Sequence, residues 1–207
     1  MRNYFLIFFL FFVHLTQAQS FTKLSNTSEC KAKIEKRAQA TYAITANFSE
    51  TVHSAMYNNP KAGSGKLKYK KSNKIRWEHV SPKKQIVLIN GSKVRLYENG
   101  KENKNAASSQ VIKKVQALMI QLFSGEFLNE KEFNIEYYES SQEYKLILKP
   151  KSSRMSKYIS KVEMYFSKKE LTLNKMILME STDERIVYGF SNIVINGQIS
   201  ESSFTQF

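Results

Sequence analysis

The stretch GKLKYKKSNKIRWEHVSPKKQIVLINGSKVRLYENG, residues 65–100, decides the fold class. In residues 74–80 apolar and charged side chains alternate, which is the period-two pattern of a strand with one buried face. An apolar run at 85–89 ends at Asn90-Gly91, and the next run ends just before Asn99-Gly100. Asn-Gly is strongly preferred in the two-residue type I′ turn of a β-hairpin. The stretch therefore predicts an antiparallel meander with two tight turns.

Further strands and two helices are expected on both sides of this meander. A helix over 31–40 is capped by Thr27 or Ser28. A second helix over 110–123 stops at Gly125. Its apolar residues have the spacing of one buried face: Val111, Val115, Leu118, Met119 and Leu122. Ten or eleven strands are predicted, at 44–52, 65–71, 74–80, 85–89, 93–97, 133–137, 144–148, 160–166, 171–179, 185–195 and 203–207, with a turn at 58–63.

These elements predict a mainly β protein with inserted helices, of the α+β class. Successive hairpins favour one antiparallel sheet, and residues 19–207 hold no Pro/Ser-rich linker or repeat that would divide them into domains. Because neighbouring strands twist by about 20–25°, so long a sheet curls into an unclosed half-barrel. Its concave side is apolar, so the helices either cover it or leave a cavity.

The N-terminus has the pattern of an export signal. Arg2 supplies the positive charge, and residues 5–13 are an apolar run that is shorter than the roughly 20 residues of a membrane-spanning helix. Thr16-Gln17-Ala18 offers a cleavage point after Ala18. Residues 1–18 are therefore predicted to be a signal peptide, and the product to be exported to the periplasm.

The chain is strongly basic, with 32 Lys and Arg against 18 acidic residues and a net charge of +14. Strand alternation places Lys66, Lys68 and Lys70 on one face, as expected for a solvated convex surface. A contact surface for an anionic membrane or an acidic partner is the alternative. No single-strand-binding motif occurs, so nucleic acid is not an expected partner.

Residues that would support catalysis or metal binding are sparse. Asp183 is the only aspartate and Cys30 the only cysteine, and residues 19–207 keep two histidines, His53 and His79, in separate strands. No GxSxG, HExxH or Walker-type motif is present. We expect no enzyme activity, no metal and no cofactor.

An ordered set of residues between 46 and 100 matches a motif in which an F-[ST]-Q strand precedes G-x-[LF]-x-[VI]-x-[RK]-P-x-x-[FI]-x-W, a proline, a turn and a tyrosine strand. The matching residues are Phe48-Ser49-Glu50, Gly65, Leu67, Tyr69, Lys71, Ile75, Trp77, Pro82, Asn90-Gly91 and Tyr97. This set resembles the periplasmic outer-membrane lipoprotein carrier family LolA. Glu50 stands where glutamine is usual, Ser72 replaces the proline, and Lys71 stands where many members have an arginine that latches the helical lid.

The resemblance implies a half-barrel whose cavity receives acyl chains. The cavity residues would be Phe48, Leu67, Tyr69, Ile75, Trp77, Val87, Ile89, Leu96, Val162, Met164 and Phe166. The helix over 110–123 would be the lid, through the five apolar residues named above, with Lys71 as its latch. Partners would be acylated lipoproteins, the inner-membrane ABC transporter that releases them, and an outer-membrane receptor or the membrane surface. The carrier itself would be a monomeric chaperone.

Burial of acyl chains gives this arrangement a physical purpose. Exposing an acyl chain to water costs about 0.8 kcal/mol per CH₂, so a lipoprotein crosses an aqueous compartment only when its chains are covered. Two alternatives remain open from the sequence. One is a half-barrel that binds another lipid, a glycolipid or a hydrophobic signal, and the other is an adaptor that uses the sheet to bind proteins.

Overall fold

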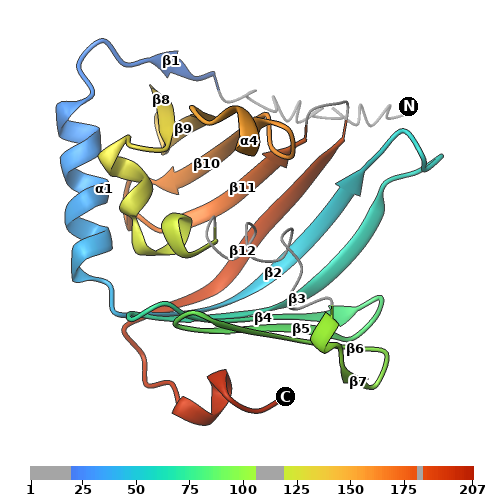
Figure 1. Cartoon of the computed structure of the whole chain (residues 1–207). Coiled ribbons are helices and arrows are strands. Elements are labelled where there is room, and N and C mark those ends of the chain that lie inside the picture. Colours follow the sequence, from blue (N-terminus) through green and yellow to red (C-terminus); the bar gives the residue numbers. More distant parts are fainter. Residues whose placement is uncertain (1–19, 106–118, 181–183) are drawn as a thin grey trace, which may run out of the picture.

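The computed structural model describes residues 20–105, 119–180 and 184–207, and Figure 1 shows one strongly twisted sheet with helices against one side. The predicted signal peptide and lid residues Val111, Val115 and Leu118 lie outside the described residues. The elements in order are β1 (Thr22–Lys23), α1 (Ser28–Ala40), β2 (Ala43–His53), β3 (Lys61–Lys70), β4 (Lys74–Ser81), β5 (Gln85–Asn90), β6 (Lys93–Glu98), β7 (Lys101–Glu102), η1 (Glu126–Asn129), β8 (Phe133–Glu139), β9 (Glu143–Pro150), α4 (Ser153–Ser156), β10 (Lys161–Ser167), β11 (Leu173–Met179), β12 (Arg185–Ile195) and η2 (Glu201–Phe204).

The sheet has 12 antiparallel strands in the order β1-β8-β9-β10-β11-β12-β2-β3-β4-β5-β6-β7. Strands that follow one another in sequence pair directly from β2 to β7 and from β8 to β12. β1 instead pairs with β8, and β12 returns to pair with β2 and thereby joins the two halves, with Phe190 opposite Phe48. The prediction of an open antiparallel sheet with inserted helices is confirmed. The count exceeds the predicted ten or eleven because β1 and β7 are strands of two residues each, too short to leave a periodic pattern.

Alternation in the sequence determines which residues face the helices. Leu67 lies opposite Trp77, Trp77 opposite Val87, and Val87 opposite Leu96, so one row of apolar side chains crosses four strands. Directly opposed residues in an antiparallel pair share a face. Ile75, two residues before Trp77, is fully buried on the same face. The concave face is thus the apolar face of the meander, as its period-two pattern predicts.

The two Asn-Gly turns differ. At the second, Asn99 and Gly100 are the two loop residues and both have positive φ, 52° and 81°, as the predicted type I′ turn requires. At the first, Asn90 pairs with Lys93, so the loop residues are Gly91 and Ser92 and positive φ is confined to Gly91. The first turn therefore has the type II′ pattern, with glycine at its first central position.

The predicted strand at 203–207 is wrong, because the C-terminal segment forms η2 and crosses the convex face of the sheet. The guanidinium of Arg76 donates to the carbonyl of Gln206 at 2.7 Å, and that of Arg95 donates to the carbonyl of Thr205 at 2.6 Å. These bonds occupy carbonyls that a strand would pair in a ladder. Phe204 is 1% exposed, so the tail also buries an aromatic ring against the convex side. The predicted turn at 58–63 is also displaced, since β3 already begins at Lys61.

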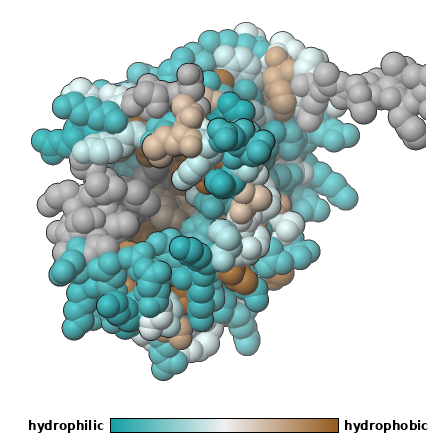
Figure 2. All heavy atoms as spheres, turned by 90° about the vertical axis from the view of Figure 1, so that its right-hand side faces the viewer, coloured by the Kyte–Doolittle hydropathy of each residue, from teal (hydrophilic) through white to brown (hydrophobic). Residues whose placement is uncertain are grey.

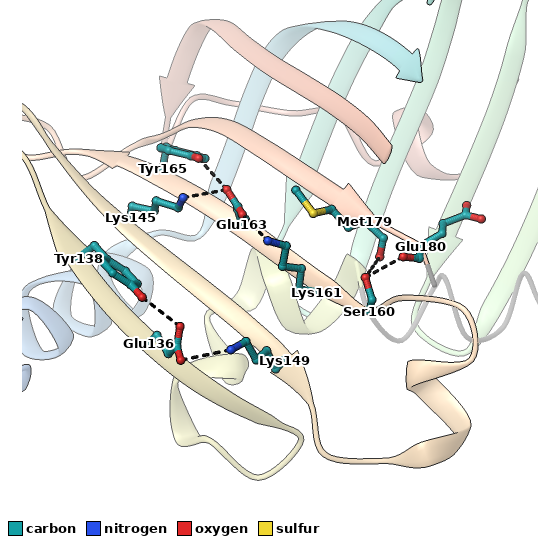
Figure 3. Close-up of polar contacts among 10 residues, drawn as sticks. All are labelled: Glu136, Tyr138, Lys145, Lys149, Ser160, Lys161, Glu163, Tyr165, Met179 and Glu180. Atoms are coloured by element: carbon teal, nitrogen blue, oxygen red, sulfur yellow. Dashed lines mark hydrogen bonds and ion pairs between the residues drawn. The ribbon is translucent and has the colours of Figure 1, made fainter. Parts of the chain in front are cut away.

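The convex face of β9–β11 carries a network of charges (Figure 3). The carboxylate of Glu163 accepts a hydrogen bond from the Tyr165 hydroxyl at 2.7 Å and pairs with Lys145 and Lys161, each at 3.0 Å. Burial raises the pKa of the Glu163 carboxyl, but the hydrogen bonds and charges of these partners lower it by more. The pKa of Glu163 therefore lies below its ordinary value. On this part of the surface, lysine side chains therefore pair with the carboxylates of neighbouring strands.

Candidate functional site

An apolar cavity lies between α1, the end of the second helix and the concave face of the sheet. Its volume is about 80 Å³. It is lined by Ile34, Arg37, Ala38, Thr41, Ile44, Ala46, Leu67, Leu122, Phe123, Gly125, Phe127, Met164, Phe166, Leu171, Thr172, Leu173, Phe190, Ile193 and Ile195. Pockets that hold a drug-sized ligand measure about 300–1,000 Å³. The cavity in this conformation is therefore too small for a ligand of that size.

The second helix ends at Ser124 and is held against α1 by a close backbone approach. Gly125 has φ +80°, and a Cβ built on it would lie 2.5 Å from the Cβ of Ala38. Glycine is the residue that adopts this left-handed conformation without steric cost and leaves room for the neighbouring helix. The predicted helix stop at Gly125 is therefore also the point where the two helices meet above the cavity.

An aromatic wall of packed rings lies on the concave face beside the cavity, on the side of the meander. Phe48 stacks on Trp77 with ring centroids 4.5 Å apart, and Tyr188 and Phe190 approach Trp77 edge-on at 5.1 Å and 6.3 Å. Phe123, from the end of the second helix, lies 6.2 Å from Trp77. Offset and edge-to-face rings of this kind attract one another beyond their burial. The helix end thus packs directly on the concave aromatic residues.

The residues predicted for the cavity divide into three groups. Leu67, Met164 and Phe166 line it, as does the lid residue Leu122. The second group packs in the same concave core without lining the cavity: Phe48, Tyr69, Ile75, Trp77, Val87, Ile89 and Val162, with lid residue Met119 at its margin. Leu96 is buried beyond this cluster, at the outer end of the row it shares with Trp77. The sheet residues of this set therefore share the concave face, and the cavity occupies one end of it.

Lys71 bonds α1 rather than the described part of the second helix. Its Nζ donates to the carbonyl of Gln39 at 2.5 Å, and its backbone N–H donates to the carbonyl of Tyr42 at 2.9 Å. A lysine beside a helix C-terminus satisfies a carbonyl that has no partner within the helix. In this structure Lys71 fastens the end of α1 to the β3–β4 turn.

Sequence reasoning missed the walls supplied by α1 and by β12. Ile34 and Ala38 face the cavity from α1, and Phe190, Ile193 and Ile195 face it from β12. The spacing of Ile34 and Ala38, four residues apart, was the available signal for the helix. On β12 a register shift between Ser191 and Val194 interrupts the alternation, which hides the inward-facing residues from a period-two reading.

A polar pair interrupts the concave face beyond the aromatic wall. The Glu50 carboxylate lies 3.3 Å from Nε2 of His79, whose ring meets Phe48 edge-on at 5.2 Å. Burial raises the pKa of Glu50, but hydrogen bonds from His79 and Tyr188 lower it below its ordinary value. Burial and the neighbouring carboxylate raise the pKa of the Tyr188 hydroxyl. Within the described part of the chain, the buried Nδ1 of His79 has no hydrogen-bond partner.

Three further features of the described ranges 20–105, 119–180 and 184–207 concern metal binding, membrane insertion and thiol reactivity. These ranges contain no group of three or more His, Cys, Asp or Glu side chains placed to hold a metal ion. None of their helices combines the length and the hydropathy needed to span a membrane. Cys30 is buried in α1, and burial raises the pKa of its thiol to about 11, which keeps the thiol protonated at neutral pH.

Comparisons with known proteins agree with the geometry. The family model "Outer membrane lipoprotein carrier protein LolA" matches residues 39–206. An outer-membrane lipoprotein carrier protein of Coxiella burnetii is 28% identical over 141 residues, which cover 68% of this chain. The chain spans 64% of that relative's length. The same-named protein of Francisella tularensis is 26% identical over 181 residues, covering 86% of this chain and 82% of its own.

Two solved structures are also similar. A LolA superfamily protein from Nitrosomonas europaea has a TM-score of 0.45 and 10% identity, over 85% of this chain and 97% of that one. A conserved protein from Thermus thermophilus has a TM-score of 0.49 and 7% identity, over 88% of this chain and 94% of that one. The family model reaches from the last residues of α1 to the C-terminal tail. Because this match covers most of the chain, the chain belongs to the outer membrane lipoprotein carrier family LolA.

Proposed function

We propose that this chain is a periplasmic carrier that buries the acyl chains of lipoproteins released from the inner membrane and delivers them to the outer membrane. The supporting observation is the apolar cavity between the helices and the concave face, whose wall is formed by Leu122, Phe123, Phe166 and Phe190. Family membership supports the same role. A releasing ABC transporter and an acceptor at the outer membrane are the partners that this role requires.

The cavity must enlarge to take an acyl chain. Its volume of about 80 Å³ is below the roughly 300 Å³ of the smallest typical ligand pockets, and Phe123 packs on the aromatic wall. Movement of the second helix away from Trp77 would join the cavity to the rest of the concave face. A carrier of this kind stays closed when empty and covers its own apolar lining, which limits aggregation.

Native mass spectrometry tests the proposal. The protein without residues 1–18 is co-expressed with a candidate lipoprotein from its own source, and complexes are measured directly. We expect a one-to-one complex that disappears when the lipidated cysteine of the cargo is replaced by serine. A folded monomer that carries a small lipid instead would favour the lipid-binding alternative, and a complex that persists without the lipid would favour a protein adaptor.

A further inference from the structure

A buried carboxylate and a partly buried one lie on opposite faces of the same sheet, and their surroundings differ. On the convex face, Glu163 is neutralised by two lysines (Figure 3). On the concave face, His79 is the single basic side chain of the described residues within 4.0 Å of Glu50, and an imidazole carries charge only when protonated. Glu50 is therefore a partly buried anion whose other hydrogen-bond partner, the Tyr188 hydroxyl, is neutral. A carboxylate in such surroundings gains from a cationic partner, which makes it a candidate binding site.

The pair is open to a ligand. The side chains of Glu50 and His79 are 14% and 19% exposed. A Cβ on Gly63, the residue opposite Glu50 on β3, would lie 3.0 Å from the carboxylate oxygen, so the glycine keeps a methyl group from crowding the carboxylate. The second imidazole nitrogen, Nδ1 of His79, is buried and has no hydrogen-bond partner within the described residues, so Nε2 is the nitrogen that faces Glu50.

The order of residues along β2 places this pair at one end of a ligand path. Ala46 lines the cavity, Phe48 belongs to the aromatic wall, and Glu50 follows on the same face. The path from Ala46 to Glu50 is four residues, about 13 Å of strand. In Figure 1, β2 runs away from α1 toward the β2–β3 hairpin, and the face on that side is hollowed at its centre in Figure 2. A ligand lying along β2 would have its apolar part near α1 and its polar part at Glu50.

We propose that Glu50 and His79 bind the polar end of the cargo, and that Glu50 recognises the α-ammonium group of a lipid-modified N-terminal cysteine. This inference rests on the proposed carrier function. A carboxylate favours a cationic N–H donor, and a charge-assisted hydrogen bond in a partly buried site is stronger than a neutral one. Cargo with a free N-terminus would therefore bind more tightly than cargo whose nitrogen carries an acyl group.

The test compares three ligands: a dipalmitoylglyceryl-cysteine peptide with a free α-amino group, the same peptide with an N-palmitoyl group, and palmitate. Affinity is measured by displacement of a fluorescent fatty acid. Glu50→Gln should bind the free-amine peptide roughly 10-fold more weakly and the other two ligands within about twofold of wild type. Glutamine is the usual residue here in the family, so the variant should fold. Glu163→Gln, which removes a more deeply buried carboxylate on the convex face, should leave all three affinities unchanged.

Equal losses for all three ligands in Glu50→Gln would overturn the proposal, because they would indicate a purely structural role. So would unchanged affinity for the free-amine peptide. An equal loss for the two peptides, with palmitate unaffected, would overturn the assignment to the ammonium and transfer it to the N–H that both peptides share. If wild-type protein bound none of the three ligands, the carrier function itself would fail, and this inference with it.

Discussion

The ring of Phe123 lies 6.2 Å from that of Trp77 and 6.1 Å from that of Tyr69, so the end of the second helix rests on β3 and β4. Two residues later, Gly125 brings the chain against Ala38 of α1. One aromatic side chain thus links the end of the second helix to the concave face beside the cavity. The strength of this contact should set how readily the cavity opens.

Phe123→Ala should ease opening. Removing the ring takes away its contacts with Trp77 and Tyr69 while leaving the half-buried helix end in place. We expect a fluorescent fatty acid to bind several-fold faster, measured by stopped-flow fluorescence. The control is Phe21→Ala, whose ring lies on the convex-face residue Tyr165 at 5.7 Å. Equal rates in wild type and Phe123→Ala would show that the contact does not gate the cavity.

Gly125→Ala should destabilise the protein more than Gly100→Ala. Both glycines have positive φ, +80° and +81°, so both variants bear the same backbone strain. At Gly125 the new methyl group would also lie 2.5 Å from Ala38, whereas at Gly100 nothing lies within 4 Å. We expect the difference in unfolding free energy, measured with urea, to be about 1–3 kcal/mol. Equal losses would mean that the two helices do not pack as described.

Acidification should destabilise the protein partly through Glu163. Its pKa in the folded state is lowered, so its contribution to stability is full above the ordinary carboxyl pKa and disappears as the pH falls through the folded value. Glu163→Gln should therefore lose less stability than wild type between pH 7 and pH 3, when urea unfolding is measured at each pH. Parallel pH profiles for the two proteins would contradict the role of its lysine and tyrosine partners.

Phe204→Ala should reveal the contribution of the C-terminal tail. The ring is 1% exposed and the tail covers the convex face near Ile86 and Leu88, which are also buried. Truncation of a buried phenylalanine costs about 3–5 kcal/mol. The neighbouring Thr205→Ala removes an exposed side chain and should cost less than about 0.5 kcal/mol. A small effect of Phe204→Ala would indicate that the tail does not form part of the packed structure.

Much of the fold follows from local sequence. Alternation at residues 74–80 gave the correct concave face, and Asn99-Gly100 gave a correct turn, because both depend on neighbours within a few residues. The conformation of the C-terminal tail does not follow from local sequence, because it is set by Arg76 and Arg95, which lie far away in the sequence. The cavity was only partly predictable for the same reason. Its walls meet through the pairing of β12 with β2, and its polar end depends on Glu50 and His79, which single-strand patterns assign to separate strands.

The pairing of β12 with β2 has a consequence for biosynthesis. Ser49 and Gly189, opposite each other in this pair, are 140 residues apart in the chain. Contacts between such distant residues form slowly, because the loop between them must close first. The first half of the sheet therefore waits for the last long strand to emerge before its concave wall is complete. A chain built in this way remains unfolded for longer than one in which every strand pairs only with its neighbours in sequence.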